Sequence, residues 1–209
     1  MGINYDQLND INKYLKNFPN AKLQIVTKNR DDKTVKELID KGYYIFGENK
    51  VQEAQNKFKN LNNSKIDLHL IGPLQTNKVK IALSLFHCIQ SIDRIKLVNE
   101  IAKCITRIKP KTKNFYLQVN IGKESQKSGI YPEYLKDLYN LCYEKKLTVS
   151  GLMCIPPVDR PCEDYFNEMR SLRDSLNPNL LLSMGMSNDY KISLECGSNL
   201  IRVGSRIFS

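Results

Sequence analysis

The sequence alternates between two kinds of segment along nearly its whole length, and this alternation limits the possible folds more than any other feature. Eight short apolar segments have the character of β-strands, at 23–27, 43–46, 68–71, 87–91, 115–121, 149–155, 181–186 and 200–204. Stretches with the apolar spacing of amphipathic helices follow them, at 33–41, 51–61, 78–85, 92–105, 132–143, 163–176 and 189–196. Strands that alternate with helices of this length indicate right-handed βαβ units and a parallel sheet.

Eight such units predict a closed (β/α)₈ barrel of the TIM type. No linker rich in glycine or proline divides the chain, so we expect residues 1–209 to form a single domain. Residues 3–17 have helical spacing and precede the first strand, which predicts an extra helix within residues 1–20 that packs on the barrel. The alternative is an open doubly wound sheet. That fold calls for a glycine-rich phosphate loop after its first strand, but the turn after Thr27 reads KNRDD.

Charge and composition bear on the class of partner. The net charge is +10, from 32 basic and 22 acidic residues, which raises the possibility of nucleic-acid binding. The charges of the two signs are interleaved, however, and the one dense basic cluster, at 107–113, falls in an expected loop. We therefore keep RNA binding as an alternative and expect no nucleic acid as the main partner.

The cysteines and the apolar runs indicate the compartment. Six cysteines without a C-x-x-C pair, together with only two histidines, argue against a zinc site or a disulfide framework, and buried reduced thiols are the simpler interpretation. No apolar run approaches the roughly 18 residues needed to span a bilayer. The N-terminal residues MGINYDQLND lack the basic start and apolar stretch of a signal peptide. We expect a soluble, cytoplasmic protein with no metal and no membrane contact.

A barrel of this type places its active face at the carboxyl ends of the strands, with phosphate held by the loops after strands seven and eight. The seventh strand runs into GMSND, where Ser187 is expected to cap a helix, and the eighth into RVGSRIF, with Gly204 and Ser205 at the entry to a short helix. Ordinary helix capping explains either serine alone. Because both occur where barrels hold phosphate, together they predict an anion site.

Lys28 stands at the end of the first strand candidate. In a closed barrel the eighth strand pairs with the first, which would place Lys28 beside the predicted phosphate site. A solvated lysine at a strand end is the alternative. An amine in this position could neutralise a phosphate or form an imine with an aldehyde, and a phosphorylated aldehyde cofactor would satisfy both features. Pyridoxal 5′-phosphate is the obvious candidate.

Several segments also resemble a known family. They are LQIVTK, FGENKVQEAQNK, LHLIGPLQTNK, VNIGKESQKSGI, GLMCIPP, SMGMSNDY and IRVGSRIF. In register through all eight units, from Lys22 to Phe208, they resemble the pyridoxal phosphate homeostasis proteins, the YggS-like family also called proline synthetase co-transcribed homologues. The resemblance implies a barrel similar to the N-terminal barrel of alanine racemase. It also implies a role in keeping free pyridoxal phosphate low yet available, and so in vitamin B6 homeostasis.

The resemblance assigns roles to individual positions. Lys28 matches the lysine that holds the cofactor as a Schiff base. Ser187, Gly204 and Ser205 match the phosphate-binding positions, in agreement with the interpretation above. Arg202 matches the arginine that faces the pyridine nitrogen of the cofactor.

Four further positions are carried over from the same resemblance. Asn49 and His69 match positions that line the strand-end face and are expected to belong to the cofactor site. Lys127 matches a lysine near the mouth of the site, and Arg30 stands where a second basic residue near the entrance is expected. The chain departs from the family pattern in having Thr27, NRDD and Ser205, none of which removes a group needed to hold the cofactor.

The predicted site favours binding over catalysis. A guanidinium cannot accept a hydrogen bond and disfavours a second positive charge nearby, so Arg202 should keep the ring nitrogen neutral and disfavour transamination. Two-base racemisation needs a second proton-transfer group on the far side of the cofactor, which alanine racemase takes from an additional β-domain. The chain stops after the eighth unit, and none of its eleven tyrosines has a motif that places it opposite Lys28. We therefore predict no catalytic residue.

Three hypotheses remain open from the sequence. The first is a non-catalytic carrier of pyridoxal phosphate, monomeric and in transient contact with apo-enzymes that use this cofactor. The second is a minimal amino-acid racemase of the same fold. The third is a basic barrel that binds RNA.

Overall fold

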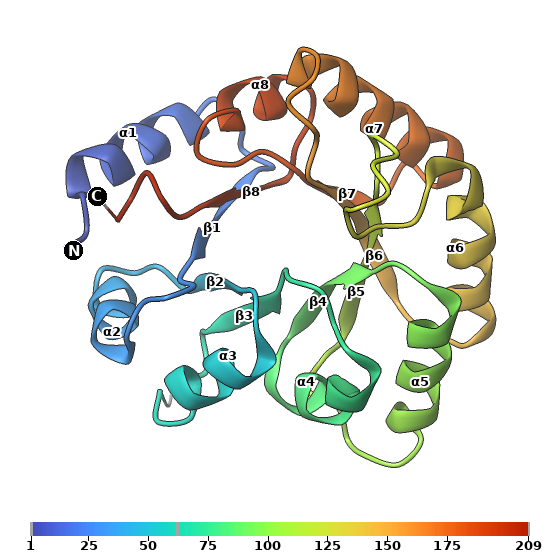
Figure 1. Ribbon diagram of the computed structural model, residues 1–209. Helices are drawn as coiled ribbons and strands as arrows, with labels where there is room; N and C mark the ends of the chain where they lie inside the picture. The colour runs from blue at the N-terminus through green and yellow to red at the C-terminus, as the bar shows by residue number, and fades with distance from the viewer. Residues whose placement is uncertain (1, 62, 209) are drawn as a thin grey trace.

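A computed structural model describes residues 2–61 and 63–208 of the chain. Eight parallel strands close into a barrel in the order β1 to β8, and helices surround it (Figure 1). The strands are β1 (Lys22–Val26), β2 (Ile45–Glu48), β3 (Asp67–Leu70), β4 (Cys88–Ile92), β5 (Asn114–Val119), β6 (Val149–Cys154), β7 (Leu181–Ser183) and β8 (Leu200–Val203). The predicted (β/α)₈ barrel is confirmed, and the open doubly wound sheet is excluded.

The helices follow the strands as the apolar periodicity predicts. They are α1 (Tyr5–Leu15), α2 (Asp32–Asp40), α3 (Val51–Phe58), α4 (Val79–Leu85), α5 (Ile95–Ile105), α6 (Leu135–Glu144), α7 (Cys162–Leu176) and α8 (Tyr190–Glu195), with short 3₁₀ segments η1 (Thr76–Lys78) and η2 (Pro132–Tyr134) before α4 and α6. The bounds differ from the prediction in places. α5 begins at Ile95 because Ile92 still belongs to β4, and β2 begins only at Ile45.

The extra N-terminal helix is present and packs on the barrel. The Asn4 side chain accepts a hydrogen bond from the Gln7 N–H at 3.0 Å and caps the first turn of α1. Leu8 and Ile11, on one face of the helix, are fully buried. The Asn4 N–H donates to the carbonyl oxygen of Ile207 at 2.7 Å, so the start of α1 lies beside the C-terminal segment (Figure 1).

Closure of the barrel brings the first and last strands side by side. β1 and β8 are parallel, with Gln24 opposite Arg202 and Ile25 opposite Val203. The turn after β8 therefore lies next to the turn after β1. Their backbones approach closely at Gly204, where an added Cβ would lie 2.9 Å from the carbonyl oxygen of Val26. A side chain at position 204 would force the two strand ends apart.

The barrel interior carries an unusually polar layer. Barrels of this type commonly fill their interior with branched apolar side chains, but here Gln24, His69, Gln90, Ser183 and Arg202 are buried. Ser183 Oγ donates to Gln90 Oε1 at 2.7 Å, and Arg202 Nη1 donates to Ser183 Oγ at 2.9 Å. The apolar core lies largely between the strands and the helices. The polar layer forms the floor beneath the carboxyl ends of the strands.

The structure also bears on membranes, metals and thiols. All six cysteines are free. Within residues 2–61 and 63–208, no helix combines the length and apolar character required to cross a bilayer. The same residues contain no group of three or more histidine, cysteine or acidic side chains arranged to hold a metal ion.

Candidate functional site

A cleft of about 890 Å³ opens at the carboxyl ends of the strands. Its wall includes six of the seven predicted cofactor-binding residues, which are Lys28, Asn49, Ser187, Arg202, Gly204 and Ser205. They come from the ends of β1, β2, β7 and β8 and from the segments that follow these strands. The topology thus brings together residues that are up to 177 positions apart in the sequence, from Lys28 to Ser205.

Lys28 is an exposed lysine on the wall of the cleft. It follows β1 in the turn that leads to α2, and its side chain is exposed. Among the residues that the structure describes, none forms a hydrogen bond or ion pair with the Lys28 amine. The neighbouring charged wall residue Lys127, in contrast, lies 2.5 Å from Glu124 Oε2. An unpaired primary amine at the wall of a cleft is available to bind an anion or to react with a carbonyl group.

The turns after β7 and β8 meet beside the turn that carries Lys28, because β8 pairs with β1. Ser205 Oγ lies 3.0 Å from Ser187 Oγ, and the N–H of Arg206 donates to Ser187 Oγ at 3.4 Å. Asp189 Oδ1 accepts a hydrogen bond from the Met186 N–H at 2.5 Å and closes the first of these turns. Two hydroxyl groups and the backbone of two turns therefore converge on one small region, as they do in anion-binding nests.

The local structure of these turns differs from the sequence prediction. The sequence predicts Ser187 as a helix cap, but α8 begins three residues later at Tyr190, directly after Asp189. The residues from Gly204 to Phe208 form a single turn, with the Ile207 N–H donating to the Gly204 carbonyl at 2.9 Å, and not a helix. The expected helix N-terminus is therefore present after β7, three residues later than predicted, whereas the described residues after β8 form no helix. Asp189 occupies the N-cap position of α8 but its side chain binds the Met186 N–H, and the last strand ends at Val203.

Arg202 forms part of the floor of the cleft. Its guanidinium is buried, donating to the Ser183 carbonyl at 2.6 Å and to the Cys154 carbonyl at 2.7 Å. Burial lowers the pKa of this guanidinium from its ordinary value, but an arginine in a protein stays protonated. Arg202 therefore presents a fixed positive charge and hydrogen-bond donors, with no acceptor, at the base of the site.

His69 does not line the cleft, contrary to the prediction. Its ring lies inside the barrel, with Nε2 3.0 Å from Asp67 Oδ1 and Nδ1 2.7 Å from Gln90 Nε2. Burial alone would raise the pKa of Asp67, but the hydrogen bond with His69 and the basic side chains nearby together outweigh burial, and the pKa is lowered.

The remaining predicted residues lie at the edge of the site. Asn49 lines the cleft, and the backbone of Gly72 packs so closely on it that a Cβ would overlap the Asn49 carbonyl oxygen. Lys127 lies in the wall, as expected for a residue near the mouth. The guanidinium of Arg30 stacks 4.6 Å from the ring centroid of Phe208, an arrangement typical of a cation–π contact.

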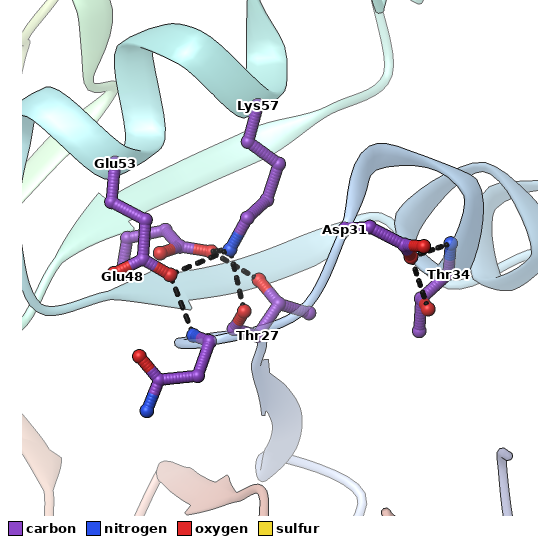
Figure 2. A network of polar contacts seen from close by, with 7 residues as sticks. Thr27, Asp31, Thr34, Glu48, Glu53 and Lys57 are labelled. Atoms are coloured by element: carbon purple, nitrogen blue, oxygen red, sulfur yellow. Dashed lines mark hydrogen bonds and ion pairs between the residues drawn. The ribbon is translucent and has the colours of Figure 1, made fainter. Parts of the chain in front are cut away.

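The structure adds residues that the sequence interpretation missed. Gln118 and Asn120 lie in the wall at the end of β5, where the alternation in LQVN places both on the interior face. The alternation in the sequence is therefore a signal that could have identified both residues. Behind Lys28, Glu48, Glu53 and Lys57 form a polar network with Thr27 (Figure 2), in which all but Glu53 are buried. These three belong to the motif FGENKVQEAQNK, of which the sequence interpretation used only Asn49.

The charge of the cleft suits a dianionic ligand. Among the residues that the structure describes, four basic side chains line it, Lys28, Lys127, Arg160 and Arg202, against one acidic residue, Asp189. A cleft lined by one sign of charge concentrates ligands of the opposite sign. With a free amine and two hydroxyl-bearing turns in the same cleft, the residues present fit a small phosphorylated aldehyde.

Comparison with known proteins points in the same direction. Residues 3–209 match the family model for the N-terminal domain of alanine racemase. A pyridoxal phosphate homeostasis protein of Aquifex aeolicus is 36% identical over 197 residues, covering 90% of this chain and 86% of the relative. A protein of the same name from Escherichia coli is 32% identical over 197 residues, covering 89% of this chain and 84% of the relative.

Solved structures agree with these matches. PipY of Synechococcus elongatus without pyridoxal phosphate superposes with a TM-score of 0.87 at 30% identity, covering 98% of this chain and 99% of PipY. PipY with pyridoxal phosphate bound gives a TM-score of 0.83 at 28% identity, covering 98% and 99%. Alanine racemase of Clostridium difficile gives 0.78 at 13% identity, covering 99% of this chain and 57% of the racemase, a likeness of fold alone.

Proposed function

The chain belongs to the alanine racemase N-terminal-domain family and to the pyridoxal phosphate homeostasis proteins, and from this premise we propose that it binds pyridoxal 5′-phosphate as a Schiff base on Lys28. The proposed role is to store and deliver this cofactor within the cell, without robust catalysis. Residues 1–209 act as one cofactor-binding domain in this proposal. The bound state of PipY supports the choice of ligand, because its barrel is that of a relative of this chain.

One observation carries the proposal above all others. Lys28 and the turn that contains Gly204 and Ser205 line the same cleft, because β1 and β8 pair in the closed barrel. In this proposal the ligand offers an aldehyde to the amine at one end and an anion to the two turns at the other. Pyridoxal phosphate carries both groups on one ring.

Each residue of the site has a defined task in this proposal. The Lys28 amine condenses with the aldehyde and releases one water, which anchors the ligand covalently. Ser187, Ser205 and the backbone at Gly204 hold the phosphate. Arg202 supplies a fixed positive charge at the ring nitrogen, and its neighbours Ser183 and Cys154 hold the guanidinium in place.

The position of Arg202 supports a binding protein over a catalyst. The cofactor withdraws electrons from a bound amino acid most strongly when its ring nitrogen is protonated. A guanidinium cannot accept a hydrogen bond from a protonated ring nitrogen, and its charge disfavours a second positive charge nearby. The site therefore favours storage of the cofactor. Incubation of the loaded protein with a single enantiomer of alanine or serine checks this: retained optical activity supports the proposal, and racemisation at enzymatic rates contradicts it.

The biological setting forms part of the same proposal. All six cysteines are free, as is usual in a reducing compartment, which supports a cytoplasmic location. Transient contact with apo-enzymes that need the cofactor is the expected route of delivery, and we expect the protein to act as a monomer. Light scattering tests the oligomeric state. Transfer is tested by mixing the loaded protein with an apo-enzyme and following the recovery of that enzyme's activity.

A spectrophotometric titration tests the ligand itself. Addition of pyridoxal phosphate to the purified protein should produce the yellow absorbance of a Schiff base at one equivalent. The Lys28→Ala variant should keep the spectrum of the free aldehyde, whereas Lys36→Ala, at an exposed lysine of α2, should behave as wild type. A yellow complex of the Lys28→Ala variant, equal to that of the wild type, would contradict the proposal.

A further inference from the structure

Lys28 occupies the second position of a four-residue turn after β1. The Arg30 N–H closes this turn by donating to the Thr27 carbonyl oxygen at 3.1 Å. Asn29, the third residue, has a φ of 59°, a left-handed conformation that few residues other than glycine adopt. No strand or helix hydrogen bonds run through such a turn. The direction of the Lys28 side chain therefore depends on the contacts that hold the turn.

Two side chains of α3 bind the peptide groups on either side of Lys28. Lys57 Nζ donates to the Thr27 carbonyl oxygen at 2.6 Å (Figure 2), and this carbonyl belongs to the peptide bond before Lys28. The Asn29 N–H, in the peptide bond after Lys28, donates to Glu53 Oε1 at 2.5 Å. Lys57 Nζ and Glu53 Oε1 are themselves 3.2 Å apart. Both peptide groups next to the Lys28 Cα are thus tied to one helix.

Glu48, the last residue of β2, completes this arrangement. Its Oε1 accepts hydrogen bonds from Lys57 Nζ at 2.6 Å and from Thr27 Oγ1 at 2.5 Å (Figure 2). Glu48 is fully buried and Lys57 is 6% exposed. Burial raises the pKa of the Glu48 carboxyl, although its bonds to Lys57 and Thr27 act in the opposite direction. Within the described part of the chain, Glu48 Oε2 has no hydrogen-bond partner.

Such a buried ion pair gives little net stability. Desolvation of the two charges offsets most of their attraction, and apolar residues of similar size often stabilise a fold as well or better. The pair does fix geometry, because each charge requires its partners at hydrogen-bond distance. Here those partners are the backbone on either side of Lys28 and the side chain of Thr27.

We propose that three side chains are positioning residues that fix the turn around Lys28 so that its amine faces the turns at Ser187 and Ser205. They are Glu53 and Lys57 of α3 and Glu48 of β2, together called the clamp. The inference rests on the proposed function, since it assigns the clamp a task only if Lys28 holds the cofactor. The clamp acts through Lys28 and does not touch the ligand: none of its three residues lines the cleft within residues 2–61 and 63–208. It therefore affects the covalent bond and not the phosphate site.

Two ligands separate the contribution of the covalent bond to binding from that of the rest of the site. Pyridoxal 5′-phosphate can form the imine, whereas pyridoxine 5′-phosphate has an alcohol in place of the aldehyde and reports only the rest of the site. The first variant is Glu53→Ala, which removes the acceptor for Asn29 and leaves the buried Lys57–Glu48 pair intact. Glu53→Gln, which keeps an acceptor oxygen, is the rescue variant. Lys59→Met, at an exposed lysine two residues after Lys57, is the matched control.

We expect Glu53→Ala to bind pyridoxal phosphate about tenfold more weakly, a loss typical of a misplaced reacting group. Its affinity for pyridoxine phosphate should not change. Glu53→Gln should restore the wild-type values, and Lys59→Met should match wild type for both ligands. A double variant, Lys57→Met with Glu48→Gln, removes both buried charges together and should show the same selective loss with a cooperative unfolding transition.

The Lys28→Met background completes the experiment. There, addition of Glu53→Ala should leave the affinity for either ligand unchanged, because the clamp has no amine to position. An equal loss for both ligands, or no loss for either, in Glu53→Ala with Lys28 present would overturn the inference. If Lys28→Met alone leaves the affinity for pyridoxal phosphate unchanged, the proposed function fails, and the inference fails with it. That result is distinguishable because it arises with the clamp intact.

Discussion

Ser205 Oγ lies 3.0 Å from Ser187 Oγ, although the two residues are 18 positions apart and follow different strands. The contact joins the turns after β7 and β8 on the wall of the cleft that carries Lys28. Two hydroxyl groups that bond to each other in the free protein can both turn to a phosphate, since each offers one proton and accepts others. This pair is the structural basis for the proposed phosphate site.

The first prediction concerns these hydroxyl groups. Ser187→Ala and Ser205→Ala should each weaken binding of pyridoxal phosphate about fivefold, which corresponds to one hydrogen bond of about 1 kcal/mol. Fluorescence or absorbance titration measures the affinities. Ser84→Ala, at an exposed serine of α4, serves as the control. Wild-type affinity in the double Ser187→Ala, Ser205→Ala variant would show that the phosphate binds elsewhere.

The second prediction concerns Gly204. An added Cβ would lie 2.9 Å from the Val26 carbonyl oxygen, and a backbone atom cannot move aside as a flexible side chain can. We expect Gly204→Ala to lower the free energy of unfolding by about 1–3 kcal/mol and to weaken binding of the cofactor. Urea unfolding gives the stability. Gly2→Ala, where an added Cβ meets nothing within 4 Å, should leave the stability unchanged. Equal stability of both variants would contradict the close approach of β1 and β8.

The third prediction concerns Arg202. Arg202→Glu places a carboxylate where the guanidinium stands, so the ring nitrogen of a bound cofactor should become protonated and the absorption spectrum of the complex should shift. Arg202→Lys keeps the positive charge and should leave the spectrum close to that of the wild type. Both variants should be less stable, by about 3–5 kcal/mol for the Glu variant, because it leaves a buried charge unpaired. An unchanged spectrum for Arg202→Glu would count against contact between this residue and the ring.

The fourth prediction concerns the pH dependence of stability. His87 Nδ1 accepts the Leu68 N–H at 2.9 Å, and burial, together with the positive charge of Lys111, lowers the pKa of His87 below 6.5. Below 6.5 the unfolded chain therefore takes up a proton more readily than the folded chain does. The contribution of His87 to stability is present above pH 6.5 and is lost as the pH falls through the lowered folded value.

Urea unfolding at about pH 7.5 and about pH 5 measures this loss. His87→Gln keeps an acceptor for the Leu68 N–H but has no proton to gain. The wild type should lose more free energy of unfolding between the two pH values than the variant does. Equal losses would show that His87 is not the group responsible.

The sequence predicts the barrel and most of the cleft because two periodic signals coincide. Short apolar segments alternate with amphipathic ones, and parallel barrels collect strand ends on one face, so the order of the segments alone places Lys28 and Ser205 on the same face. The exact ends of the elements are less well determined by the sequence. The prediction puts Ser187 at a helix start, yet Asp189 precedes that helix, because both residue types favour the same position.

Two other features could not be predicted from the sequence. The prediction puts His69 at the cleft, but which residue of LHLI reaches it depends on where the strand stops, and the histidine lies below that end, inside the barrel. Glu53 and Lys57 have the spacing of an exposed ion pair on a helix surface. Only the packing of α3 on the turn after β1 shows that Lys57 points inward.

The most direct measurement is mass spectrometry of the protein after borohydride reduction in the presence of pyridoxal phosphate. Reduction fixes an imine as a stable secondary amine, so proteolysis and peptide mapping identify the modified lysine. We expect one pyridoxyl group per chain, on Lys28, with no adduct in the Lys28→Ala variant. Modification spread over several surface lysines, or concentrated on a lysine outside the cleft, would contradict the account.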